Sequence, residues 1–183
     1  LKIVFDKDIL YFPPGEYRGK LIIAEGRYTI PIFLKINPFA QVIVNKERIH
    51  LKLKNIPFEI SNKEEVEIVV KTNLQDWQLK FEFSKDFTHE DGKSSFPLEN
   101  VFYSKKNNFI NSKNKKFDQS DNNFKKANYL YPAYFSKDKN TNISNNNGEY
   151  TLKLNIWADI RENWNRAKAG EYEGEILFTF INI

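Results

Sequence analysis

Alternation of apolar and polar side chains with a period of two residues constrains the fold of this chain more than any other sequence feature. The clearest runs cover residues 49–53, 77–83 and 150–156. Successive side chains of a β-strand point to opposite faces of a sheet, so such runs predict strands with one buried and one wet face. Further β-rich runs are separated by turn residues and cover residues 20–24, 28–36, 40–44, 65–70, 97–103 and 175–183. We therefore predict an all-β chain that folds as an antiparallel sandwich.

The size of the chain fits one globular domain with a sizeable core. It has 183 residues, of which 40% are hydrophobic and 28% are charged. Its apolar runs are far shorter than the roughly 18 residues that a membrane-spanning helix needs, and the strand-like start at residues 1–5 does not resemble a signal peptide. We expect no membrane span.

The sequence contains neither methionine nor cysteine. Because an initiator methionine is missing, we expect the chain to begin inside a longer precursor, after a removed secretion signal or at a trimmed boundary. The lack of cysteine excludes disulfides, thiolate metal sites, iron–sulfur clusters and cysteine nucleophiles.

Residues 104–147 differ in composition from the rest of the chain. They contain nine lysines, three aspartates, twelve asparagines and no arginine, so they carry a net charge of +6, whereas the whole chain carries +4. A Lys/Asn-rich stretch of this length predicts a long surface insertion. Apolar residues with helical spacing occur at Phe117, Phe124, Ala127 and Tyr131, but asparagine and aspartate disfavour helices, so we expect at most a short helix.

A short internal echo indicates a repeat. The motif G-E-Y-x-G, followed by a charged residue and aliphatic residues, begins at Gly15 and again at Gly170. Each copy is expected to form a glycine-opened turn or bulge, a tyrosine anchor and a following strand. The interpretation is that residues 1–36 carry the closing strand of a preceding unit, while residues 37–183 form a more complete sandwich domain.

Two further features allow a comparison with a known class. Thr72 and Asn73 end one strand shortly before Trp77 opens another, and the last strand is entered through an A-G-x-Y-x-G turn at residues 169–174. In this order of motifs the chain resembles the immunoglobulin-like sandwich modules of bacterial surface and pilus-associated proteins. The resemblance implies a non-catalytic, extracellular structural or adhesive module. The chain departs from antibody-type domains because Trp77 has no cysteine pair beside it.

Residues suited to metal or acid–base chemistry are few. His50 is expected on the wet face of a strand, and His89 has carboxylates beside it, although a solvated hairpin loop is the preferred interpretation. Residues 138–149 place side-chain oxygens in a calcium-loop register, but Ile143 stands where glycine is needed, so a surface loop is preferred and calcium stays open. Carboxylate pairs for glycoside hydrolysis also stay open, because only geometry identifies them. The seven glycines form no phosphate-binding motif. We predict no catalytic residues, no cofactor and no metal.

Surface aromatic residues are the candidates for ligand binding. Trp157 follows the inward Ile156 and is therefore predicted on the outer face of its strand, and Trp164 lies in a polar run. The insertion interleaves lysines with aromatic residues, which would suit an anionic polymer, but phosphate sites usually use arginine, so nucleic acid is not expected. The candidate set for a glycan is Trp157, Trp164, Tyr129, Tyr131 and Tyr134.

The combined expectation is a non-catalytic structural or interaction module, of adhesin or pilus type, in a bacterial exported or cell-surface protein. Its expected partners are other proteins or neighbouring modules, and its expected location is extracellular, at the cell surface or periplasmic. The alternative is a carbohydrate-binding module that uses the surface aromatic residues.

Overall fold

The structure is a computed structural model of the chain, and it describes residues 12–23, 25–46, 48–54, 60–110, 116–127, 133–136, 148–161 and 167–183. These residues form antiparallel β-sheets and one short 3-10 turn, η2 (Leu98–Asn100), with no α-helix among them. The predicted all-β, antiparallel class is therefore confirmed.

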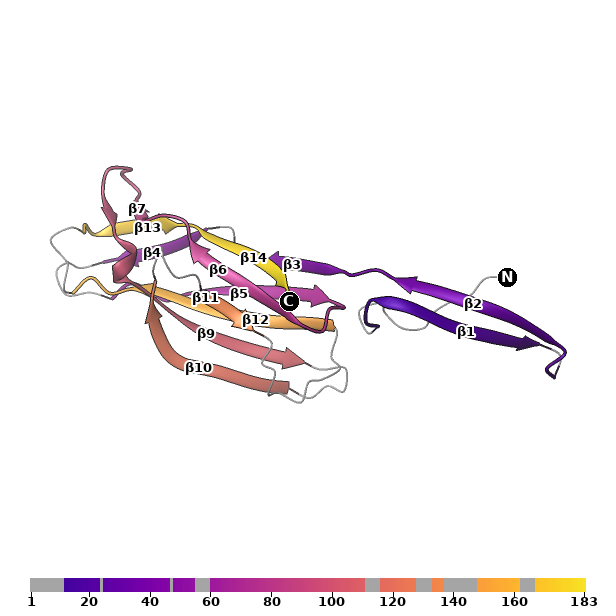
Figure 1. Cartoon of the computed structure of the whole chain (residues 1–183). Helices are drawn as coiled ribbons and strands as arrows, with labels where there is room; N and C mark the ends of the chain where they lie inside the picture. Colours follow the sequence, from indigo (N-terminus) through magenta and orange to yellow (C-terminus); the bar gives the residue numbers. More distant parts are fainter. Residues whose placement is uncertain are drawn as a thin grey trace.

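The largest sheet has five strands in the order β10-β9-β12-β5-β3. Its central strand β12 (Gly148–Ala158) pairs with β5 (Glu64–Thr72) on one side and with β9 (Val101–Ile110) on the other. The outer strands are β10 (Lys116–Lys126) and β3 (Ala40–Val44). All of its pairs are antiparallel, and Figure 1 shows these strands together in one layer.

Two smaller sheets contain the other strands of the body. One sheet has the order β11 (Ala133–Ser136), β6 (Trp77–Phe83), β14 (Ile176–Asn182), and the other has the order β4 (Ile49–Leu53), β13 (Gly170–Gly174), β7 (Phe87–His89), β8 (Ser95–Phe96). Only Glu175 separates β13 from β14, so one nearly continuous run of chain belongs to both small sheets.

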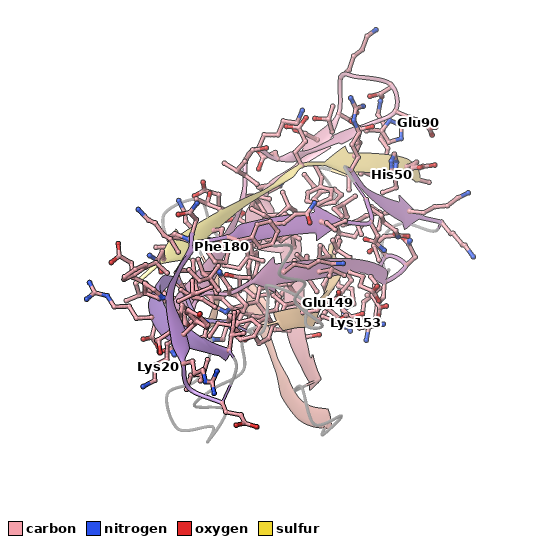
Figure 2. All side chains as sticks on the ribbon, turned by 90° about the vertical axis from the view of Figure 1, so that its right-hand side faces the viewer. Lys20, His50, Glu90, Glu149, Lys153 and Phe180 are labelled. Carbon is pink, nitrogen blue, oxygen red and sulfur yellow. The ribbon has the colours of Figure 1, made fainter. Side chains whose placement is uncertain are left out.

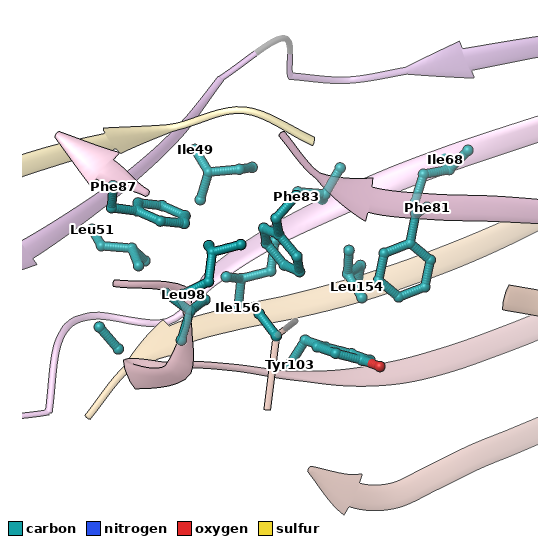
Figure 3. Close-up of a cluster of buried hydrophobic side chains, with 14 of the residues drawn as sticks. Ile49, Leu51, Ile68, Phe81, Phe83, Phe87, Leu98, Tyr103, Leu154 and Ile156 are labelled. Carbon is teal, nitrogen blue, oxygen red and sulfur yellow. The ribbon is translucent and has the colours of Figure 1, made fainter. Parts of the chain in front are cut away.

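The core lies where side chains of the five-stranded sheet meet those of the smaller sheets. Trp77 of β6 makes an edge contact with Tyr150 of β12 at 5.0 Å between ring centroids, and Phe81 contacts Tyr103 of β9 at 5.2 Å. Figure 3 shows this cluster, in which Phe81, Phe83 and Tyr103 face aliphatic residues of the neighbouring strands. Trp77 is 1% exposed, which confirms the prediction from its alternating run.

The first two strands form a sheet of their own. β1 (Gly15–Ile23) pairs with β2 (Tyr28–Ile36) along its whole length, and this hairpin extends from one end of the body (Figure 1). The bounds predicted for residues 28–36, 40–44, 49–53 and 77–83 agree with the observed strands.

Three predictions need correction. Residues 104–147 were predicted to form a surface insertion, but their described part contributes strands to both layers. β9 continues to Ile110, β10 pairs with β9, and β11 pairs with the core strand β6 and buries Phe135. Residues 116–126, where at most a short helix was expected, form β10: asparagine and aspartate disfavour a helix, and pairing with β9 satisfies the backbone groups. The segment predicted as a turn at residues 169–174 contains strand β13.

Candidate functional site

Trp157 lies on the outer face of the five-stranded sheet, as its alternation with Ile156 predicts. It is half-buried, and its ring stacks on Phe102 of the neighbouring strand, with a centroid separation of 6.2 Å and an interplanar angle of 17°. The ammonium of Lys63 lies 5.0 Å from the centroid of the Trp157 ring. A cation–π contact of this kind contributes about 0.5–1 kcal/mol at an exposed site. A sugar that stacks on Trp157 has to compete with Lys63 for the ring.

The other aromatic candidates do not join Trp157 in a described cluster. Trp164, Tyr129 and Tyr131 lie outside the described residues. Tyr134 lies in β11, with its backbone opposite Lys80 of β6, so it belongs to a different sheet from Trp157. The described residues therefore place one predicted ring, Trp157, at an outer surface.

Ion pairs occupy part of this outer face. Lys153 of β12 reaches Glu65 of β5 at 2.6 Å and Glu67 at 3.6 Å, and Lys71 reaches Glu149 at 3.0 Å. The hydrogen bond to Glu65 raises the pKa of Lys153. Figure 2 labels Glu149 and Lys153 near one another on this part of the molecule. These charged residues of β5 and β12 thus pair with one another on the solvent side of the sheet.

His89 has a structural environment that the sequence did not predict. The imidazole is 8% exposed, not solvated, and packs against Tyr172 at 4.9 Å between ring centroids. Nε2 lies 3.1 Å from the carbonyl oxygen of Ala169, which can only accept, so Nε2 donates; Nδ1 accepts the N–H of Asp91 at 3.1 Å. Both ring nitrogens are used within the protein, and His89 ties the end of β7 to the start of β13.

Asp91 organises the turn beside His89. Its carboxylate accepts the backbone N–H groups of Lys93 and Ser94 and pairs with the ammonium of Lys168 at 3.0 Å. These contacts, led by the N–H of Lys93, hold the pKa of Asp91 well below its ordinary range. The carboxylate closes a turn and is not an acid–base group poised near neutral pH.

Metal binding has no described centre. Among the residues that the structure describes, no group of three or more histidine, aspartate or glutamate side chains could hold an ion. His50 lies on the exposed face of β4, as predicted, and contacts Glu171 at 2.8 Å. Most of the calcium-type register at residues 138–149 lies outside the described residues.

A surface hollow of about 400 Å³ lies where β13 passes into β14. Its lining combines Arg48, Ser84 and Glu175 with Ile176 and Leu177. Ser84 and Lys85 both bind Glu175, at 3.2 and 3.5 Å, so the Glu175 carboxylate is already paired within the protein. The hollow presents no convergent set of catalytic groups.

Tyr172 anchors the start of the closing strands. Its side chain is fully buried, and its hydroxyl accepts the N–H of Lys168 at 2.7 Å and donates to the carbonyl of the same residue at 3.1 Å. Burial raises the pKa of this phenol. The hydroxyl thus bonds to the backbone four residues upstream and fixes the corner that leads into β13.

The echo of this segment at the amino-terminal side repeats the same contact. The hydroxyl of Tyr17 donates to the carbonyl of Pro13, also four residues upstream, at 2.7 Å. Gly15 and Gly170, each two positions before its tyrosine, both have positive φ, 155° and 142°. The two G-E-Y-x-G segments therefore share backbone geometry and a tyrosine bond, which supports the predicted anchoring role. They differ in burial, because Tyr17 is 37% exposed.

One face of the β1–β2 hairpin is apolar and lacks a described covering layer. Directly opposite residues of an antiparallel pair share a face, and the pairs of this face are Tyr17 with Leu34, Gly19 with Ile32, Leu21 with Ile30, and Ile23 with Tyr28. We call these eight residues the apolar hairpin face. Tyr28 is 65% exposed, and Tyr17, Ile23 and Ile30 are exposed too, whereas Leu21, Ile32 and Leu34 are half-buried. The opposite face carries the charged residues Glu16, Arg18, Lys20 and Lys35, together with Ile22 and Phe33.

A buried asparagine holds the base of the hairpin to the body. Asn73, which is fully buried, accepts the N–H of Phe39 at 2.8 Å through Oδ1 and donates from Nδ2 to the carbonyl of Asn37 at 2.9 Å. The hydroxyl of Thr72 donates to the carbonyl of Phe39 at 2.8 Å. The segment between β2 and β3 is therefore fixed by side-chain bonds from the end of β5. From the sequence, Thr72 and Asn73 were identifiable only as the end of the strand before Trp77.

Comparisons with known proteins return no relative. No protein-family model matches the sequence, and neither the curated proteins nor the solved structures contain a significant match. In the described part of the chain, no helix has the length and apolar character needed to cross a membrane.

Proposed function

We propose that this chain is a non-catalytic structural or interaction module of a bacterial exported or cell-surface protein, with an immunoglobulin-like sandwich fold. The observation that carries the proposal is the hairpin: its apolar face is partly exposed, and its base is held by the buried Asn73. An exposed apolar surface of this kind marks an interaction site more often than a catalytic one.

The immunoglobulin-like assignment draws on two features of the body. The buried Trp77 packs in the core between sheets, and the Tyr172 hydroxyl binds the backbone four residues upstream. Immunoglobulin-type sandwiches use a buried tryptophan and a tyrosine corner in comparable ways. Neither feature involves reactive chemistry.

The absence of enzymatic activity is part of the proposal. The described imidazoles and the strongly acidic Asp91 serve internal contacts: His89 joins β7 to β13, His50 contacts Glu171, and Asp91 closes a turn. A catalytic group needs a free position aimed at a substrate.

The experiment that tests this role combines location with binding. Protease treatment of intact source cells should cleave the protein from outside, and an array of glycans should retain none of it. Cytoplasmic protection from protease, or hydrolysis of any glycan in the array, contradicts the proposal.

A carbohydrate-binding module is the second candidate, favoured by the stacked pair of Trp157 and Phe102 on an outer face. In this case a glycan would quench tryptophan fluorescence in the parent protein and not in Trp157→Ala. The matched control is Lys63→Ala, which uncovers the Trp157 ring and should strengthen sugar binding if the ring is the platform.

A further inference from the structure

The two G-E-Y-x-G segments have equivalent positions 155 residues apart, which allows a residue-by-residue comparison. β1 corresponds to β13 and the start of β14. In the body, Tyr172 contacts Phe96 at 4.6 Å and His89 at 4.9 Å between ring centroids. Tyr17 occupies the equivalent position in β1 and makes the equivalent hydroxyl bond, but no described ring packs on it.

The second glycine of the motif, Gly174 in the body and Gly19 in β1, lies beneath an aromatic ring only in the body. A Cβ atom at Gly174 would lie 2.5 Å from ring atoms of Phe87, so only glycine fits beneath this ring. A Cβ atom at the equivalent Gly19 would meet nothing within 4 Å. Gly19 also has no positive φ that would favour glycine. If an aromatic ring lay over Gly19, as Phe87 lies over Gly174, it would explain why glycine stands at position 19.

The exposure of Tyr17, Ile23, Tyr28 and Ile30 on this face agrees with a missing layer. In the body the positions after the motif, Ile176 and Phe178, pack against the core, whereas the equivalent Leu21 and Ile23 lie on the apolar hairpin face. A two-stranded sheet with a partly exposed apolar face is marginally stable in water and needs a further layer to cover it.

The geometry points to one occupant: the apolar hairpin face is the docking site for a preceding β-sheet module of the same kind. β1 is the closing strand of that module. The inference rests on the proposed role as an interaction module and names its partner. The partner supplies an aromatic ring over Gly19 and apolar residues against Tyr17, Leu21 and Ile23, as Phe87, Phe96 and the core do for β13 and β14.

Charge shows that the partner is related to this chain but not identical with it. Glu173 pairs with Arg48 at 2.8 Å and Glu175 with Lys85 at 3.5 Å, while the equivalent positions of β1 hold Arg18 and Lys20. An identical body would set Arg48 against Arg18 and Lys85 against Lys20. We therefore expect acidic residues at those two positions of the preceding module. Figure 2, which views the molecule from the hairpin end, labels Lys20 on β1.

The first experiment compares this chain with its natural polypeptide extended by about one repeat, roughly 155 residues, on the amino-terminal side. Amide hydrogen exchange of β1 and β2 should slow by about tenfold or more in the extended polypeptide. Gly19→Phe fills the space of the expected ring and should abolish this protection. The matched control Thr29→Phe lies on the opposite face of the hairpin and should not.

Several results would overturn the inference. One is an upstream sequence without a β-rich module; another is equal hairpin exchange in both polypeptides. A third is hairpin protection that is already complete in residues 1–183 and is lost when residues 1–11 are removed, because that segment would then be the occupant. Since none of these results concerns glycan binding or cell location, the inference can fail while the proposed function stands.

A second experiment tests the equivalence of β1 and β13–β14 inside the full chain. Replacing residues 170–178 by the sequence of residues 15–23 changes five positions, and its charge changes are Glu173→Arg and Glu175→Lys. We expect a clearly lower melting temperature, which Arg48→Glu with Lys85→Glu restores. The version that keeps both glutamates should melt close to the parent. If that charge-matched version is unfolded, the two segments are not equivalent.

Discussion

Asn73→Ala is the substitution that most sharply tests how the hairpin is joined to the body. Asn73 is fully buried, and its amide makes one bond to the Phe39 N–H and one to the Asn37 carbonyl. Each bond contributes about 0.5–1.5 kcal/mol, and the partners lie in residues that are themselves exposed, so water can replace part of what is lost. We expect the free energy of unfolding to fall by about 1–3 kcal/mol in total.

Guanidinium unfolding followed by circular dichroism measures this loss, and amide exchange at Phe39 locates it. The Phe39 N–H should exchange much faster in the variant, because its acceptor is gone. Asn155→Ala is the matched control: this asparagine is half-buried on the outer face of β12, so the change should stay within about 0.5 kcal/mol. Equal effects of the two substitutions, or unchanged exchange at Phe39, would show that the Asn73 bonds do not hold the hairpin to the body.

Three further predictions concern the core and the closing strands. Trp77→Ala should cost about 3–5 kcal/mol in chemical denaturation through the cavity it leaves, and clearly more than Trp157→Ala, since Trp157 is half-buried on an outer face. Burial raises the pKa of Tyr150 from 10.0 to about 12, so its neutral form contributes about 3 kcal/mol that is present below pH 10 and lost between pH 10 and 12; unfolding curves of Tyr150→Phe should lack this loss. Gly174→Ala should lower the melting temperature because the new Cβ would overlap an aromatic ring at 2.5 Å, whereas Gly19→Ala should leave it unchanged in this chain; equal shifts would contradict the comparison.

The strands that alternation predicted well are those with one face in the core. Residues 49–53 and 77–83 bury every second side chain, so the sequence pattern and the burial pattern coincide. The missed strands lack that pattern. β13 is rich in glycine and glutamate and is held by pairing with β4 and β7, while β10 is rich in lysine and asparagine and is held by β9.

The candidate surfaces were predictable to different degrees. The outward position of Trp157 followed from its neighbour Ile156, but its contacts with Phe102 and Lys63 depend on strand pairing and on residues distant in sequence. The burial of His89 was missed because its sequence neighbours are polar; the imidazole fits there since Gly170, without a side chain, leaves room for it. Local composition does not record such long-range packing.

The β-rich run at residues 28–36 predicted β2, and the structure adds that Tyr28 and Ile30 of this strand are exposed. This exposure, with the open space above Gly19, supports the docking of a preceding module on the hairpin.

An experimental structure of the natural polypeptide extended by one repeat would show whether this docking occurs. The quantity to measure is the exposed fraction of Tyr17, which is 37% in this chain, against 0% for the equivalent Tyr172. We expect Tyr17 to be buried there, with an aromatic ring of the preceding module over Gly19. A Tyr17 side chain that stays as exposed as it is in this chain, with open space above Gly19, would show that no module docks on the hairpin.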